Sequence, residues 1–243
     1  MIDYSYLSFQ GDYEINEDHI GIVDLPQRKC FIIADGLGGH GKGEVASSVA
    51  VNYAKYILTQ CKYIDRNVLK DCFIGAHNQL KMIQENEHVI RGVKTTMVIL
   101  AIEGEVAYWG HVGDSRLYAF NRFRISEQTK DHSVPQMMVA MGEITEKEIR
   151  GNPDRNRLLS ALGMDGGIPK IEIHTPVMKV KNGNAFLLCT DGFWEWIKEN
   201  NMEHCHRMSS SAGSWLEKMA KIVQENGQSG QMDNFSAITV KIR

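Results

Sequence analysis

The chain has 243 residues with 27 basic and 30 acidic side chains, a net charge of −3 and a hydrophobic content of 43%. This near-balance of charge lacks the basic surplus that drives binding to nucleic-acid phosphates, so we expect no nucleic-acid partner. The sequence contains no apolar run long enough to span a membrane, no basic-then-apolar leader, and five cysteines without C-x-x-C spacing. We therefore predict a cytoplasmic protein with mostly buried free thiols and no membrane association.

The N-terminal part of the chain predicts strands followed by two helices. Residues 4–9 and 19–25 read as strands, and the apolar run 30–34 reads as a buried central strand. Apolar residues then recur at helical spacing over 46–57 and 69–83, which predicts two amphipathic helices. The polar loop between the first two strands ends in Glu17 and Asp18, which taken alone fit a solvated hairpin rim equally well.

Antiparallel hairpins dominate the rest of the sequence. Further strands are predicted at 94–102, 105–112, 117–120, 170–175, 184–189 and 236–242, and a further helix at 214–224. Residues 130–163 form an excursion over one edge of the domain, with a short helix opened by the capping box Thr145-x-x-Glu148. The segment 203–206 superficially resembles a metal cluster, but adjacent residues do not converge on one ion, so we predict a solvated segment. No linker or repeat divides residues 1–243, and we predict one domain.

The glycine-rich turn after the central strand supports three interpretations. Gly36-x-Gly38-x-x-Gly41 matches a dinucleotide-binding fingerprint, and the same turn nearly matches a phosphate-binding P-loop. Gly43 stands where a P-loop has Ser or Thr, and Asp35 would repel a pyrophosphate. The hairpin-dominated order also lacks the β-α-β alternation that both nucleotide folds require. The third interpretation makes Asp35 a metal ligand.

Acidic residues recur where predicted strands begin or end. The set comprises Asp35, Asp114, Asp191 and Asp233, with Glu17 and Asp18 beside an early strand. Each alone is explained by the preference of aspartate for turns. Strand ends meet at one edge of a sheet, however, so these side chains can lie together. Carboxylates about 5 Å apart repel by roughly 3 kcal/mol per pair at an effective dielectric of ~20. Such a cluster binds hard divalent cations, and oxygen ligands suit Mg²⁺ or Mn²⁺.

Seven stretches of the sequence together resemble one family. They are Asn16-Glu17-Asp18, Ala34-Asp35-Gly36-Leu37-Gly38-Gly39-His40, Lys94-Thr95-Thr96, Gly113-Asp114-Ser115-Arg116, Asp131-His132-Ser133, Thr190-Asp191-Gly192 and Asp233-Asn234. In this order they are similar to short bacterial members of the metal-dependent protein phosphatase 2C family of serine/threonine phosphatases. The resemblance implies an α+β fold, a four-layer α-β-β-α sandwich of two antiparallel sheets flanked by helices. It also implies that residues 130–163 form a flap that shapes substrate access.

The resemblance assigns roles to the acidic residues. Asp35 is expected to bridge two metals, with the Gly36 carbonyl on one and Asp191 and Asp233 on the other. Glu17 and Asp18 either bind these metals or support the residues that do. Asp114, together with Asp191, resembles the ligands of a weaker third metal, so the expected cofactors are two or three Mn²⁺ or Mg²⁺ ions.

The implied reaction is hydrolysis of phosphoserine and phosphothreonine by a water that bridges two divalent metals, without a phosphoenzyme. His40 either donates a proton to the leaving oxygen or only hydrogen-bonds a carboxylate. Tyr13 departs from the family, which usually has a phosphate-binding arginine there, and Lys42 or Arg116 are candidates to replace that charge.

The predicted partners are phosphoproteins, including a serine/threonine kinase and its targets, and the predicted state is a monomer. The alternative function is a non-catalytic, metal-dependent phosphoprotein-binding module, and a nucleotide-binding protein ranks third.

Overall fold

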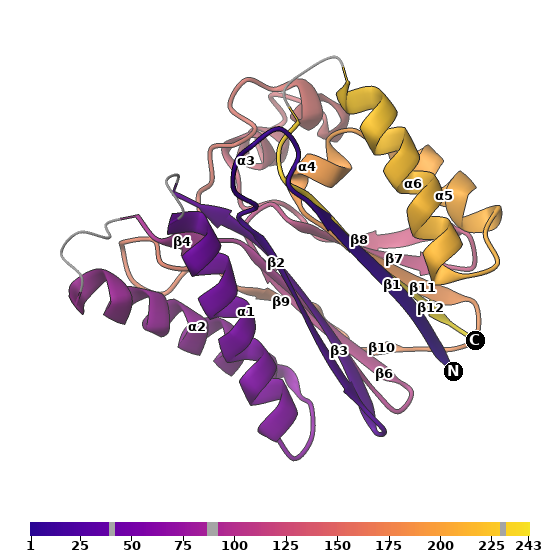
Figure 1. Ribbon diagram of the computed structural model, residues 1–243, viewed down its shortest axis with the longest axis horizontal. Coiled ribbons are helices and arrows are strands. Elements are labelled where there is room, and N and C mark those ends of the chain that lie inside the picture. Colours follow the sequence, from indigo (N-terminus) through magenta and orange to yellow (C-terminus); the bar gives the residue numbers. More distant parts are fainter. Residues whose placement is uncertain (39–41, 87–91, 229–231) are drawn as a thin grey trace.

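Two antiparallel β-sheets lie face to face in the computed structural model, and helices cover the outer face of each (Figure 1). The structure describes residues 1–38, 42–86, 92–228 and 232–243. The predicted α+β, four-layer α-β-β-α sandwich is confirmed.

The first sheet carries the glycine-rich turn. Its main strands run in the order β10 (Met178–Lys179), β6 (Val106–Val112), β5 (Met97–Glu103), β3 (Arg28–Leu37) and β2 (Asp18–Leu25). Two short strands join this path, with β4 (Lys94–Thr95) on β3 and β9 (Glu172–Ile173) on β6. The outer face is covered by helices α1 (Lys42–Gln60) and α2 (Arg66–Asn86).

The second sheet joins the two ends of the chain. Its strands run in the order β1 (Ile2–Phe9), β12 (Phe235–Ile242), β11 (Asn184–Cys189), β7 (Arg116–Asn121) and β8 (Arg124–Gln128). Its outer helices are α4 (Asp191–Trp194), α5 (Glu199–Arg207) and α6 (Ala212–Gly227). The segment 130–163 contains α3 (Val134–Ala140) and the 3-10 helix η1 (Glu146–Gly151). The capping box of Thr145 and Glu148 opens η1, as predicted.

The central strand β3 shows why its apolar run is continuous. Phe31 and Ile33 belong to the core between the sheets, whereas Cys30 and Ile32 belong to the core beneath α1 and α2. Successive strand side chains point to opposite faces, so a strand buried on both faces needs apolar residues at every position. This strand ends at the same end of the molecule as β11, opposite the N- and C-termini (Figure 1).

Three local predictions need correction. The predicted strand 94–102 is interrupted at Thr96, whose hydroxyl accepts the Asp35 N–H and contacts the Ser115 hydroxyl. The predicted solvated segment 203–206 is wrong, because it lies in α5, where Cys205 and His206 are buried. The predicted strand 170–175 is shortened to β9. The prediction of free, mostly buried thiols is confirmed, with Cys61 the half-buried exception.

Candidate active site

A cavity of about 540 Å³ opens where the strand ends of the two sheets meet. It brings together seven of the residues singled out from the sequence, which are Tyr13, Glu17, Asp35, Gly36, Asp114, Asp191 and Asp233. These residues come from separate strand ends and loops, so the fold itself assembles the acidic cluster.

Asp18 and Asp35 face each other across the β2–β3 pair, where they are direct register partners. Like charges at opposed positions of a sheet are destabilising, so this pairing needs compensation. The Thr190 hydroxyl donates to Asp18 Oδ2 at 2.9 Å. Asp18 lies just behind the cavity wall, buried at 6% exposure.

Glu17 is held against the turn that joins β3 to α1. The Gly36 N–H donates to the Glu17 carbonyl at 3.1 Å, and the Gly43 N–H donates to Glu17 Oε1 at 3.2 Å. A Cβ on Gly36 would lie 2.1 Å from the Gly43 carbonyl oxygen, and a Cβ on Gly43 would lie 2.5 Å from the Glu17 carboxyl. Gly36 and Gly43 are therefore required for close backbone packing rather than for binding a nucleotide.

Asp191 and Asp233 sit at neighbouring ends of β11 and β12. Each carboxylate accepts the N–H of its own next residue at 2.7 Å. Asn234 then ties this corner to the acidic loop, because its Oδ1 accepts the Glu17 N–H at 2.8 Å and its Nδ2 donates to the Ile15 carbonyl.

Burial and mutual repulsion raise the pKa of the whole cluster. Burial, opposed in part by hydrogen bonds, raises the pKa of Asp18 to about 7, and burial and the nearby Asp131 charge raise that of Asp114 to about 7. The pKa values of Asp35 and Asp191 lie well above the usual range, because of burial first and neighbouring aspartates second. Burial also raises the pKa of Asp233. When ionised, the cluster would therefore carry more negative charge than its surroundings neutralise.

The donor set fits divalent metal ions. Asp18 Oδ1 and Asp114 Oδ1 are buried and have no hydrogen-bond partner within the described parts of the chain. Buried polar atoms without partners are costly, and carboxylate oxygens are the ligands that Mg²⁺ and Mn²⁺ prefer.

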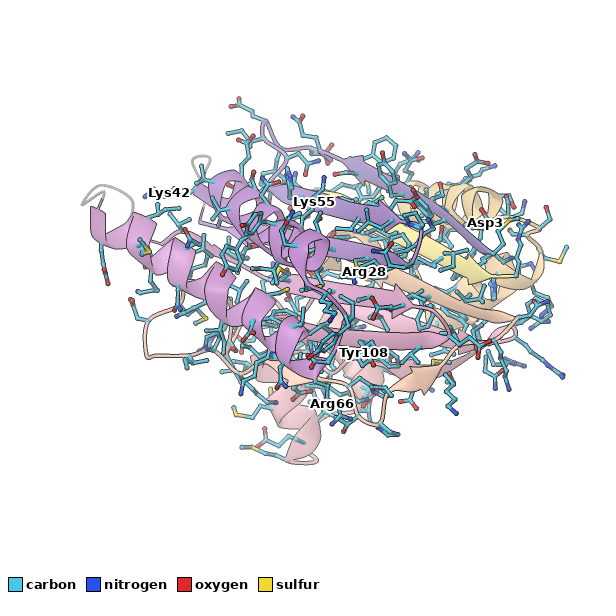
Figure 2. The ribbon with its side chains drawn as sticks, turned by 90° about the horizontal axis from the view of Figure 1, so that it is seen from below. Asp3, Arg28, Lys42, Lys55, Arg66 and Tyr108 are labelled. Carbon is cyan, nitrogen blue, oxygen red and sulfur yellow. The ribbon has the colours of Figure 1, made fainter. Side chains whose placement is uncertain are left out.

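The candidates for phosphate binding lie in different places. Tyr13 lines the cavity at its mouth, with 47% of its surface exposed. Lys42 lies at the N-terminal end of α1, ahead of Lys55 along the helix (Figure 2), and does not line the described cavity. His40 falls outside the described residues.

The suggestion that Arg116 replaces the family arginine needs correction. Its guanidinium is buried and donates to both carboxylate oxygens of Asp131, at 2.8 and 2.7 Å. A third donor reaches the Tyr118 hydroxyl, and the group lies 3.4 Å from the centre of the Trp194 ring. With its donors committed inside the protein, Arg116 does not face the cavity.

Arg155 is a residue that the sequence analysis missed. Its Nε donates to Glu195 Oε1 at 2.7 Å, and its charge opposes the rise in the pKa of Asp233. It belongs to the segment 130–163, whose Asn156 and Leu158 line the cavity. No motif identified it, because only the fold brings this segment back to the acidic cluster.

Comparison with known proteins agrees with this geometry. The family model described as protein phosphatase 2C matches residues 10–235. The chain belongs to the protein phosphatase 2C family. It is 29% identical to the serine/threonine phosphatase stp of Listeria welshimeri over 233 residues, covering 93% of this chain and 90% of the relative. It is 25% identical to the protein phosphatase PhpP of Streptococcus pneumoniae, covering 93% and 92%.

Solved structures show the same fold. The serine/threonine phosphatase Stp1 of Staphylococcus aureus superposes with a TM-score of 0.88 at 26% identity, covering all of this chain and 96% of that one. The catalytic domain of PstP, solved in complex with two manganese ions, superposes with a TM-score of 0.80 at 22% identity, covering 99% and 97%.

Family membership settles the class of activity. This protein phosphatase 2C member is a metal-dependent serine/threonine protein phosphatase, and the non-catalytic binding module is set aside. Within the described residues, no helix is long and apolar enough to cross a membrane.

Proposed function

We propose that this chain acts as one catalytic domain over residues 1–243 and dephosphorylates phosphoserine and phosphothreonine in proteins. The substrates would include a serine/threonine kinase and its targets, and the enzyme would act as a cytoplasmic monomer. The observation that carries the proposal is the buried, uncompensated carboxylate cluster at the cavity.

Two or three Mn²⁺ or Mg²⁺ ions fit this cluster best. Asp35 and the Gly36 carbonyl, with Asp191 and Asp233, would hold the main pair, and Asp114 would serve the weaker third site. Glu17 would orient the end of β3 that carries Gly36. When bound, such cations acidify water and neutralise the oxygens of a phosphoryl group.

The residues at the cavity mouth position the phosphate. The Tyr13 hydroxyl donates one neutral hydrogen bond where the family usually has an arginine, so it gives no bidentate charged contact. The charge of Arg155 opposes the rise in the pKa of Asp233, so this side chain can also attract the phosphate. Lys42 does not line the described cavity, and its contact with the phosphate stays a prediction, as does a proton-donating role for His40.

Hydrolysis of p-nitrophenyl phosphate with Mn²⁺ and with EDTA tests the proposed chemistry. We expect turnover with Mn²⁺ or Mg²⁺ and none with EDTA. Hydrolysis that survives EDTA would contradict the role of the carboxylate cluster. A phosphoserine and a phosphotyrosine peptide of the same sequence then test the substrate class, with preference expected for phosphoserine.

Isothermal titration with Mn²⁺ tests the third site. Asp114→Ala should lose or weaken one binding event and raise the Mn²⁺ concentration needed for activity, while the tighter events persist. Unchanged stoichiometry and affinity would show that Asp114 holds no metal.

A further inference from the structure

A second group of ligand-type side chains lies outside the carboxylate centre, beside the β6–β9 pair. His111 and Glu172 are direct partners in that pair, and the ring of His132 stacks on His111 with centroids 4.5 Å apart. One ligand atom from each of the three residues lies within 4.8 Å of the others. None of the three lines the carboxylate cavity.

The side chain of His132 has a buried nitrogen that favours a bound cation. Its side chain is 1% exposed, and its Nε2 lies 3.5 Å from Glu172 Oε1. This nitrogen has no hydrogen-bond partner among the residues that the structure describes. A buried polar atom in that state requires an explanation, and a cation between His132 and Glu172 supplies one.

The other two residues make contacts that leave them able to bind a cation. His111 Nε2 lies 2.7 Å from the Lys130 carbonyl oxygen, the kind of contact that fixes the ring of a metal-binding histidine. Lys170 Nζ lies 2.5 Å from Glu172 Oε1, but the lysine side chain is 67% exposed and can leave for solvent. Next to the cluster, a cavity of about 120 Å³ lined by His111 and Glu172 provides room for water and a path for an ion.

We propose that His111, His132 and Glu172 form a binding site for a divalent cation of the zinc class, separate from the carboxylate centre. Two imidazoles, one carboxylate and a water form a known zinc ligand set, whereas Mg²⁺ prefers oxygen ligands throughout. The two sites therefore select different metals in the same molecule.

The site is connected to the turn of Gly113 and Asp114, and Asp114 is the proposed ligand of a third metal. The Gly113 N–H donates to His132 Nδ1 at 3.2 Å, so the neutral ring carries its proton on Nε2. A cation bound to Nε2 displaces the proton from that atom. The ring stays neutral if Nδ1 takes up a proton, and that N–H would then face the Gly113 N–H. The turn at Gly113 must therefore shift when the cation binds. Gly113 precedes Asp114, and occupancy of the site should raise the Mn²⁺ concentration needed for phosphatase activity.

Cobalt spectroscopy separates the two sites. The holoenzyme is titrated with Co²⁺ in saturating Mg²⁺, which occupies the oxygen ligands. Four-coordinate Co²⁺ with imidazole ligands absorbs strongly in the visible range, whereas octahedral Co²⁺ with oxygen ligands absorbs weakly. We expect one strongly absorbing Co²⁺ per chain, displaced by Zn²⁺.

Variants assign the absorbing ion to these side chains. His111→Gln and Glu172→Gln should each weaken this Co²⁺ binding by at least about tenfold, as expected when a ligand or its support is lost. The control is His174→Gln, which changes a histidine lining the same small cavity but outside the cluster, and it should leave the signal unchanged. Thermal unfolding in Mg²⁺ verifies that each variant is folded.

The proposal is overturned if wild-type protein gives no strong Co²⁺ absorption, or if His111→Gln and Glu172→Gln leave it unchanged. Either result would mean that the three residues form only a structural hydrogen-bonding cluster. The absorption readout needs no substrate, so its outcome is independent of the proposed phosphatase chemistry.

Discussion

Two groups of buried ionisable side chains lie close together in this enzyme, and only one of them is compensated by opposite charge. In one, Asp131 receives two hydrogen bonds from Arg116, whose guanidinium packs on Trp194. In the other, Asp18, Asp35 and their neighbours gather around a cavity, and their pKa values rise because burial and repulsion are not balanced.

The presence or absence of a compensating partner separates structural from functional groups among these buried ions. A compensated pair is neutralised within the fold, and removing one partner is costly because it leaves the other unpaired in a medium of low dielectric. An uncompensated cluster is retained at a cost to stability, and a bound cation offsets that cost. Substitutions in each group test this distinction.

The largest expected effect is on activity. Asp35→Asn or Asp191→Asn should reduce kcat to below about a tenth of wild type at saturating Mn²⁺, since each removes a charged ligand of a shared metal centre. The metal-free variants should be folded and at least as stable as wild type, because repulsion is relieved. Steady-state kinetics and thermal unfolding in EDTA measure the two effects.

Asp24→Asn is the control for this experiment, because Asp24 is an exposed β2 aspartate that pairs with Lys29 and Tyr4. It should retain normal activity. Turnover above about a tenth of wild type in Asp35→Asn would reject its assignment as a core ligand.

The compensated pair should show the reverse pattern. Arg116→Met leaves Asp131 buried without its partner, and the free energy of unfolding should fall by about 3–5 kcal/mol. Adding Asp131→Asn should recover much of that loss, because no buried charge then remains. Urea unfolding measures both, and a loss below about 1 kcal/mol in Arg116→Met, the range of an exposed ion pair, would show that the pair is not structural.

The buried strands and the acidic centre were predictable for physical reasons, whereas the four-layer sandwich was implied only by the family resemblance. Continuous apolar runs such as 30–34 indicate strands buried on both faces, and strand-end aspartates meet because strand ends meet. The cavity lining confirms that Asp35, Asp114, Asp191 and Asp233 come together.

The sequence could not show which partner each cationic side chain would face. Arg116 lies in a motif beside Asp114, but its partner Asp131 is brought to it by the fold. Arg155 reaches the cluster from the segment 130–163 and lies outside every motif identified there. Helix α5 was missed because its charged residues hide the buried i, i+3, i+4 set Met202, Cys205 and His206, a spacing that a helical-period search could have found.

A charge added at the cavity mouth should have a smaller effect. Tyr13→Arg is expected to lower the KM for p-nitrophenyl phosphate by about tenfold. In free energy this is near the lower end of the roughly 1.5–3 kcal/mol that a charge-assisted hydrogen bond contributes. The lower end is expected because Tyr13 is 47% exposed. The value of kcat should change less. Tyr13→Phe is the matched control and should raise KM slightly. An unchanged or raised KM in Tyr13→Arg would indicate that another cation, such as Arg155, already fills the role.

The last expected effect is on the pH dependence of stability without metal. Burial raises the pKa of Asp18 and of Asp114 from 3.8 to about 7, so between these values the folded state binds more protons than the unfolded state. The free energy of unfolding contributed by these groups must therefore decrease as pH rises from about 4 to about 7. Thermal unfolding in EDTA should show this decrease in wild type and a shallower one in Asp18→Asn, which cannot ionise. With Mn²⁺ present the trend should reverse, because ionised carboxylates bind the cation. Identical pH slopes for wild type and Asp18→Asn in EDTA would mean that Asp18 is already compensated in the folded protein, as Asp131 is by Arg116.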